Sequence, residues 1–94
     1  MVKYMLSMLM DEIKDAGMML DYTEDALDMD MTASAMWFKN HAKARIDMLK
    51  SDYDYIAREI GLVEKAKGGD AIADALMCHL DYQISELNHR LNAI

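Results

Sequence analysis

One pair of side chains near the C-terminal end has the spacing of a metal site. Glu86 and His89 are three residues apart, so in a helix they share one face and could offer a carboxylate oxygen and an imidazole nitrogen to one ion. On a helical wheel, however, both point away from the apolar seam that contains Leu80 and Leu87. We therefore expect a solvated pair. A metal site built from Glu12, Glu86 and His89 would need a symmetric dimer to bring them together.

Four polar residues border the apolar stripes of the first two predicted helices. His41, Arg45 and Asp52 fall on one border of the second stripe, and Glu12 borders the first. Two interpretations of Arg45 stay open: it pairs with Glu12 or Asp52 through a charge-assisted hydrogen bond between helices, or it extends along the bundle edge into solvent. Glu12, Arg45 and Asp52 are thus the candidates for a structural ion pair.

No other constellation indicates a reaction. Cys78 and His79 are adjacent, so they diverge around a helix and do not form a nucleophile with its base. The acidic clusters in 21–30 and 47–54 lack the glycine and the spacing of a calcium loop. Gly68-Gly69 follows no predicted strand and precedes no lysine, unlike a phosphate-binding loop. We expect no catalytic residue, no enzyme activity and no cofactor.

Composition and charge describe a small acidic helical protein. The 94 residues suffice for one domain, and the absence of proline together with only four glycines suits a chain that is almost wholly helical. Ten basic against seventeen acidic residues give a net charge of −7, which disfavours binding to nucleic acid or anionic membranes and favours basic partners. The single cysteine, Cys78, cannot form an intramolecular disulfide, and no signal peptide or transmembrane segment is visible. A cytoplasmic location is the expectation.

Apolar residues recur every three or four positions over three long segments, which predicts three helices. We expect them at about 2–28, at 32–60 with a possible extension to 67, and at 70–93. The three seams are Val2, Leu6, Leu9, Ile13, Ala16, Leu20, Thr23 and Leu27, then Ala35, Phe38, Ala42, Ile46, Leu49, Tyr53, Ile56 and Ile60, then Ala73, Met77, Leu80, Ile84, Leu87, Leu91 and Ile94.

Polar and flexible residues mark the ends of these helices. Asp30 or Thr32 could cap the second helix and Asp70 the third, while Gly61 offers the second helix an early end. Connections as short as these favour neighbouring helices that run in opposite directions. The fold class is therefore all-α, either an antiparallel up-down-up bundle or a helical hairpin with a third helix laid against it.

The chain has more large apolar residues than the seams can bury. On the second helix a parallel track through Trp37, Met48 and Tyr55 widens the apolar arc, as expected of a central helix that contacts both others. On the first helix, methionines and tyrosines lie away from a complete seam and indicate a surface that a second copy or another protein covers. The candidate interaction surface is Tyr4, Met8, Met18, Met19, Tyr22, Met29 and Trp37.

Residue type and helical register also match a known pattern in three short segments. They are Leu9–Ala16, Ala35–Phe38 and Ala42–Leu49, which read LMDEIKDA, AMWF and AKARIDML. Together they resemble short ferritin-like helical proteins of bacteriophages and prophages, over roughly the first sixty residues. The resemblance implies a ferritin-like bundle in a bacterial cytoplasm.

The same resemblance implies a metal site whose ligands have changed. Ferritin-like sites use a Glu on one helix and a Glu-x-x-His on its neighbour, and Glu12 matches the first position. Arg45 and Met48 stand where the second motif has Glu and His, and neither is a suitable ligand for iron. We therefore expect a metal site that has been converted into a structural pair.

Three classes of function follow. The preferred one is a non-catalytic, acidic, helical protein-interaction module of phage or prophage origin, which forms a homodimer or docks on a protein partner, with basic partners favoured by its charge. The second is a ferritin-like metal-binding protein of the di-iron type. The third is an acidic inhibitor that occupies the basic groove of a nucleic-acid-binding enzyme, such as an antiviral defence nuclease.

Overall fold

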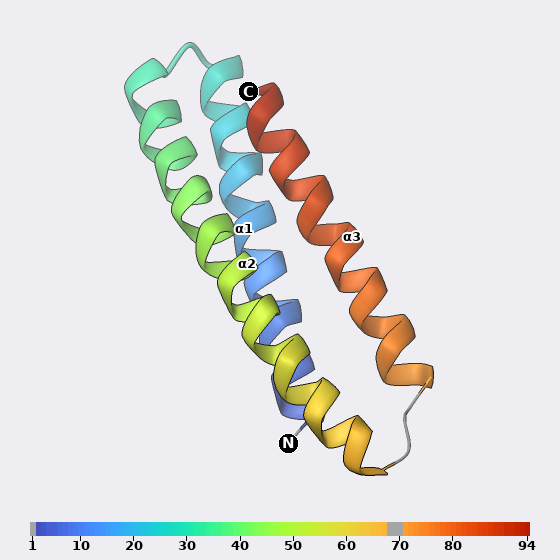
Figure 1. Ribbon diagram of the computed structural model, residues 1–94. Coiled ribbons are helices and arrows are strands. Elements are labelled where there is room, and N and C mark those ends of the chain that lie inside the picture. The colour runs from blue at the N-terminus through green and yellow to red at the C-terminus, as the bar shows by residue number, and fades with distance from the viewer. Residues whose placement is uncertain (1, 68–70) are drawn as a thin grey trace.

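The computed structural model describes residues 2–67 and 71–94, and every regular element within these ranges is an α-helix. α1 spans Val2–Asp28, α2 spans Thr32–Lys67 and α3 spans Ala71–Ala93. α1 leads from one end of a rod to the other, α2 returns beside it, and α3 follows the direction of α1 again (Figure 1). The rod measures 54 × 17 × 16 Å along its principal axes. The prediction of an all-α chain with three long helices is confirmed.

α2 is the longest helix because it continues through Gly61 to Lys67, the later of the two ends expected from the sequence. A glycine inside a helix costs about 1 kcal/mol relative to alanine. Buried seam residues on the preceding turns, Ile56 and Ile60, hold this part of α2 against the bundle. None of the described helices combines the length and the apolar character that crossing a bilayer requires. The expected cap at Asp70, and the side chains of the seam residues Val2 and Ala73, lie outside the described residues.

A residue in the left-handed conformation ends α1. Asp30 has a φ of 58°, and its amide donates to the carbonyl of Leu27 at 3.0 Å. The amide of Met31 donates to the carbonyl of Ala26 at 2.8 Å. These two bonds form a Schellman motif in which aspartate takes the place that glycine usually occupies.

The start of α2 differs from the expectation. The carbonyl of Met31 accepts the amide of Ala35 at 2.9 Å, so Met31 holds the N-cap position. The expectation that Asp30 or Thr32 caps this helix is therefore wrong. Asp30 is used to end α1, and Thr32 is already the first residue of α2.

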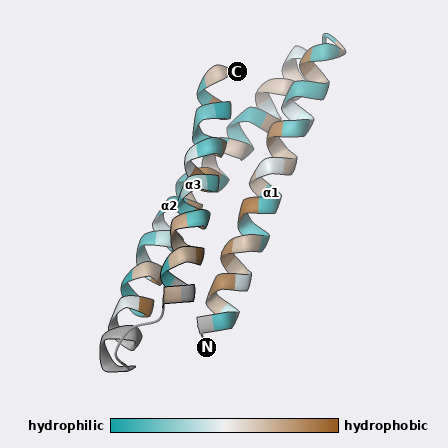
Figure 2. Ribbon diagram, turned by 90° about the vertical axis from the view of Figure 1, so that its right-hand side faces the viewer, coloured by the Kyte–Doolittle hydropathy of each residue, from teal (hydrophilic) through white to brown (hydrophobic). Residues whose placement is uncertain are grey.

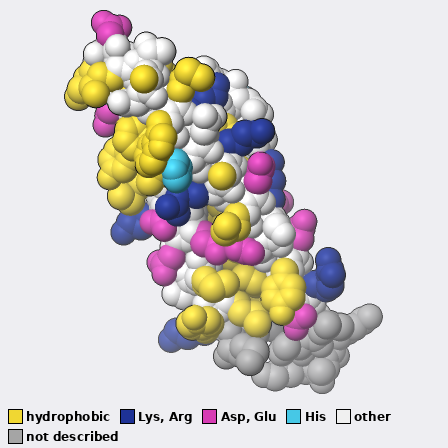
Figure 3. All heavy atoms as spheres, turned by 90° about the vertical axis from the view of Figure 1, so that its left-hand side faces the viewer, with side chains coloured by type: hydrophobic (Ala, Val, Ile, Leu, Met, Phe, Trp, Pro, Cys, Tyr) yellow, Lys and Arg dark blue, Asp and Glu magenta, His cyan; other side chains and the backbone are white. Residues whose placement is uncertain are grey.

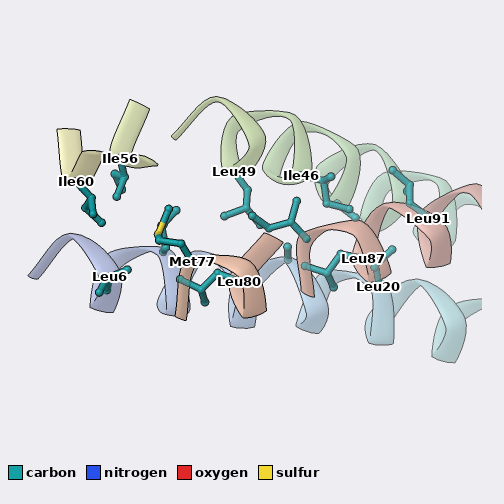
Figure 4. Packing of buried hydrophobic residues seen from close by; sticks show 14 residues of the cluster. Leu6, Leu20, Ile46, Leu49, Ile56, Ile60, Met77, Leu80, Leu87 and Leu91 are labelled. Atoms are coloured by element: carbon teal, nitrogen blue, oxygen red, sulfur yellow. The ribbon is translucent and has the colours of Figure 1, made fainter. Parts of the chain in front are cut away.

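The hydrophobic core lies along the axis of the rod, where the three seams meet. In Figure 4 the labelled side chains of Leu20, Ile46 and Leu87 point from three different helices into the same space. Apolar residues recur along α1 and α3 at intervals of about one turn (Figure 2). Each fully buried leucine or isoleucine contributes about 1.5–3 kcal/mol to folding. The core is Leu6, Leu9, Ala16, Leu20, Ala42, Ile46, Leu49, Ile56, Ile60, Met77, Leu80, Ile84, Leu87 and Leu91.

The seam of α1 shifts by one residue near its C-terminal end. Leu27 was expected to face inward but is 44% exposed, and Ala26 is 6% exposed in its place. Adjacent residues lie about 100° apart around a helix, and Ala26 lies on the side of the turn into α2, where its carbonyl accepts the Met31 amide. Thr23 is fully buried at the point where the shift begins, and its hydroxyl donates to the carbonyl of Met19 at 2.8 Å.

A charged cluster that sequence reasoning missed holds α3 against α1. The Arg90 guanidinium Nη2 lies 2.8 Å from Asp21 Oδ1 and 3.0 Å from Glu24 Oε1. These two carboxylates raise the pKa of Arg90 above its usual value. Arg90 lies 69 positions from Asp21 and 66 from Glu24 in the sequence, and only the packed bundle brings them together.

Replacing Gly61 by alanine tests the continuity of α2. A Cβ at this position would meet no atom within 4 Å, so only helix propensity changes. We expect Gly61→Ala to stabilise the protein by about 0.5–1 kcal/mol and to raise its melting temperature by about 3–6 °C in circular dichroism. Gly17→Ala, whose Cβ would lie 3.7 Å from Leu87 Cδ2, is the matched control and should stabilise α1 similarly. A lower melting temperature for Gly61→Ala alone would contradict an uninterrupted helix.

Substitution of Asp30 tests the turn between α1 and α2. Glycine adopts positive φ without a Cβ penalty, so we expect Asp30→Gly to raise the free energy of unfolding by about 0.5–1 kcal/mol. Asp30→Ala should lower it by about 1 kcal/mol, because alanine visits the left-handed region at greater cost. Denaturant unfolding measures both. Equal effects of the two variants would argue against a left-handed residue 30.

Candidate interaction surface

The outer faces of α1 and α2 form the side of the rod that α3 does not cover. α3 packs on the other side, where Gly17 approaches Leu87 and Arg90 meets Asp21. Figure 3 shows this uncovered side, with hydrophobic side chains in two groups and acidic and basic side chains between them. We call it the outer α1–α2 face.

An aromatic cluster forms the first hydrophobic group, next to the turn between the helices. The ring of Phe38 lies 5.5 Å from Tyr22 on α1 and 5.2 Å from Trp37, measured between ring centroids. Trp37 lies 4.1 Å from the imidazole of His41, one turn further along α2. Such ring pairs contribute about 0.5–1.5 kcal/mol beyond the area they bury. Trp37 is nevertheless 56% exposed, so one side of the cluster is open.

The second hydrophobic group lies towards the other end of the rod. On α2 Tyr55 is 58% exposed, and on α1 Met8 and Tyr4 are exposed as well, while Met48, which is 63% exposed, lies between the two groups. His41, Met48 and Tyr55 are spaced by seven residues, as are Met8, Asp15 and Tyr22 on α1 and Met29 just after its end. Seven-residue spacing keeps side chains on one face of a helix and is typical of a face that packs against another helix.

The structure places most of the predicted interaction surface at the solvent boundary, with one exception. Tyr4, Met8, Met18, Tyr22, Met29 and Trp37 are exposed. Met19 is partly buried and packs against the core, because it lies on the side of α1 that meets α2.

The second apolar track of α2 does not have the role expected of it. Trp37, Met48 and Tyr55 were expected to cover a second neighbouring helix, but all three are exposed, and α3 contacts α2 through other residues such as Tyr53. Met48 and Tyr55 were not predicted to belong to the interaction surface. The seven-residue spacing of His41, Met48 and Tyr55 was the sequence signal that could have indicated it.

The charged band between the two groups contains the predicted ion-pair residues. Arg45 Nη1 lies 3.7 Å from Asp15 Oδ2, and both side chains are largely exposed. Pairs of this kind contribute about 0–1 kcal/mol. Among the described residues, the ion pair of Arg45 is with Asp15 and not with Glu12 or Asp52, because Asp15 lies at the same level of the rod. This partner is neither of the two that the sequence suggested, and the exposed guanidinium pairs with the neighbouring helix.

Glu12 and Asp52 do meet, but without a cation between them. Burial, a hydrogen bond with the facing Asp52 carboxyl and repulsion by its charge together raise the pKa of Glu12 to about 7. Glu12 Oε2 is buried and has no hydrogen-bond partner within the part of the chain that the structure describes. Near neutral pH the Glu12 carboxyl is therefore partly protonated.

The three candidate metal ligands, Glu12, Glu86 and His89, do not meet at one site. Glu12 lies between α1 and α2, whereas Glu86 and His89 are exposed on α3. The carboxylate of Glu86 accepts a hydrogen bond from Tyr82 and raises the pKa of that phenol. Within residues 2–67 and 71–94, no three histidine, cysteine or acidic side chains are placed to hold a metal ion.

A groove of about 340 Å³ lies between α2 and α3. Two hydrogen bonds join α2 to α3 here: the Tyr53 hydroxyl donates to the Met77 carbonyl at 3.2 Å, and Lys50 Nζ donates to Asn88 Oδ1 at 2.9 Å. The thiol of Cys78, on α3, is free and exposed. The groove is lined by Lys50, Tyr53, Asp54, Asp81, Ile84, Ser85 and Asn88.

Comparisons of the chain with protein-family models, curated proteins and solved structures find no match. Function is therefore argued from the outer α1–α2 face itself.

Glu12 makes stability depend on pH in a defined direction. Its pKa in the folded chain is about 7, above the ordinary value of 4.5, so the folded state binds the proton more tightly than the unfolded state does. The resulting stabilisation is complete below pH 4.5, declines as pH rises, and is lost above pH 7. Partial solvent access limits the effect to about 1–2 kcal/mol.

We expect Glu12→Gln to be more stable than the unchanged protein at pH 8 and to lose this pH dependence. Denaturant unfolding at several pH values between about 5 and 8 measures both effects. Asp11→Asn removes the same charge from an exposed position on α1 and should keep the pH dependence. Parallel stability curves for Glu12→Gln and the unchanged protein would show that Glu12 is not the titrating group.

Proposed function

We propose that this chain is a non-catalytic protein-interaction module that binds a protein, which can be a second copy of itself, through the outer α1–α2 face. The observation that carries the proposal is the exposed row of aromatic and methionine side chains on the side α3 leaves open. An antiparallel bundle of the ferritin-like type, a phage or prophage origin and a bacterial cytoplasmic location belong to the same proposal. They are supported by the resemblance of the first sixty residues or so.

Side-chain chemistry supports binding to protein. Tryptophan, tyrosine and arginine dominate the energetics of protein interfaces, and Trp37, Tyr55 and Arg45 are all exposed on this face. Methionine adapts its shape to irregular partners. Clustered exposed apolar side chains that are rimmed by polar ones are typical of protein interaction sites.

Net charge supports a second candidate function. A charge of −7 on 94 residues suits an inhibitor that enters the basic groove of a nucleic-acid-binding enzyme. Such binding would weaken steeply with salt and would be competed by DNA, whereas binding through the aromatic and methionine residues would not. A ferritin-like metal protein has only the facing Glu12 and Asp52 in its favour, and metal analysis of the purified protein tests it.

Site-specific cross-linking tests the proposed function. We expect a photoreactive phenylalanine analogue at position 37 to give protein cross-links in the cells that make the chain, because this position lies on the outer α1–α2 face. The analogue at position 82 is the matched control, since Tyr82 is 63% exposed but lies on α3. Mass spectrometry of the products identifies the partner. Equal yields at both positions, or no product at either, would overturn the proposal.

A further inference from the structure

We infer that the partner of the outer α1–α2 face is a second copy of the chain, related by a two-fold axis that crosses the rod at right angles close to Met48. The inference rests on the proposed function, because it names the partner of that same surface. In this dimer the copies lie face to face and point in opposite directions. α2 lies along α2 of the partner, and α1 lies along α1 of the partner.

The order of side chains along α2 is nearly symmetric about Met48. His41 precedes Met48 by seven residues and Tyr55 follows it by seven. On α1, the level of Met48 falls between Asp15, which pairs with Arg45, and Glu12, which faces Asp52, so that Tyr22 lies on one side of the axis and Met8 on the other. A two-fold axis at this level therefore places the aromatic cluster of each copy over the Tyr55 and Met8 group of the other. Apolar groups meet apolar groups at both ends of the interface.

Charge complementarity selects this orientation. Arg45 lies three residues before Met48, about 4.5 Å along the helix, and Asp52 lies four residues after it, about 6 Å. The axis thus brings Arg45 of each copy to the level of the other copy's Asp52 and Glu12. Glu12 Oε2, which is buried and has no hydrogen-bond partner among the described residues, belongs to this acidic pair. The interface is isologous, so the same pairing forms twice.

The parallel arrangement lacks this match. If the two rods pointed in the same direction, each residue would face the same level of the partner. The facing carboxyls of Glu12 and Asp52 would then meet the same carboxyls of the second copy. Like charges placed face to face at an interface cost several kcal/mol. The net charge of −7 opposes association in either orientation, but repulsion between distant exposed charges is screened beyond about 8–10 Å.

The area available is sufficient for a weak dimer. From Trp37 to Tyr55 the face extends over 18 residues, or about 27 Å, and two helices are about 20 Å wide. Each copy would therefore bury about 500 Å², and the pair about 1,000 Å², the lower limit for a specific interface. Two α1 and two α2 helices would form a four-helix core in which every adjacent pair runs in opposite directions. We expect a dissociation constant in the micromolar range.

Substitution at the axis tests the position of the interface. Met48→Glu introduces two facing negative charges at the axis, and the 63% exposure of Met48 means that the single chain should still fold. We expect it to weaken dimerisation about 10–100-fold in sedimentation equilibrium. Met10→Glu is the matched control, because Met10 is exposed but lies seven and fourteen residues before Gly17 and Glu24, which face α3. The control should leave dimerisation unchanged.

Complementary charge reversal tests the pairing. We expect Arg45→Glu and Asp52→Arg each to lose self-association, since each variant places like charges at the two symmetric contacts. Mixed together they should form a heterodimer, visible by its mass in native mass spectrometry. One contact would then pair Glu at position 45 with Arg at position 52, and the other would keep the original pairing. Circular dichroism of each variant verifies folding, and Arg45→Gln offers a milder loss of the same contact.

The outcomes separate this inference from the proposed function. An unchanged protein that is monomeric at about 500 μM, or a dimer disrupted by Met10→Glu and not by Met48→Glu, overturns the inference. So does a mixture of the charge variants that gives no heterodimer. If position 37 still cross-links to a different protein, the interaction module stands and only the choice of partner fails. If position 37 gives no cross-link at all, the proposed function fails as well.

Discussion

Burial of one apolar seam from each of three helices is the interaction on which the rest of the molecule depends. Leu20, Ile46 and Leu80 come from different helices and have almost no exposed surface. Because helices gain most of their stability in proteins from packing of an apolar face, α1, α2 and α3 depend on one another. The seams run along most of the rod and hold the helices in one axial register. This register sets every other contact between side chains.

The register between α1 and α2 creates the chemistry of the outer face. It sets Tyr22 beside Phe38, Asp15 beside Arg45, and Glu12 beside Asp52 at successive levels. The last contact is unfavourable between two charged carboxylates, and it persists because the seams on either side hold the helices together. The protein accommodates it by binding a proton at Glu12. An unfavourable electrostatic contact maintained by apolar packing is the kind of feature that a partner's cation can relieve.

Packing of α3 decides which apolar residues stay uncovered. Arg90, with Asp21 and Glu24, attaches α3 to one side of α1, and Tyr53 reaches Met77 from α2. The opposite side of the α1–α2 pair has no covering helix among the described residues, although its apolar residues have the spacing of a helix-packing face. α3 thus covers one side of the α1–α2 pair and leaves the apolar residues of the other side exposed. Self-association is one physical way to cover the open side.

Local periodicity determined the three helices, their inward faces, the acidic surface and the surplus of methionine and tyrosine, because these depend on the angular position of each residue around its own helix. Only the tertiary structure decided that Arg45 meets Asp15, that Ala26 replaces Leu27 in the seam, and that Trp37, Met48 and Tyr55 stay exposed. Angular position says which way a side chain points but not which residue of another helix lies at the same level. That level, and the side on which α3 packs, follow from contacts between residues far apart in the sequence.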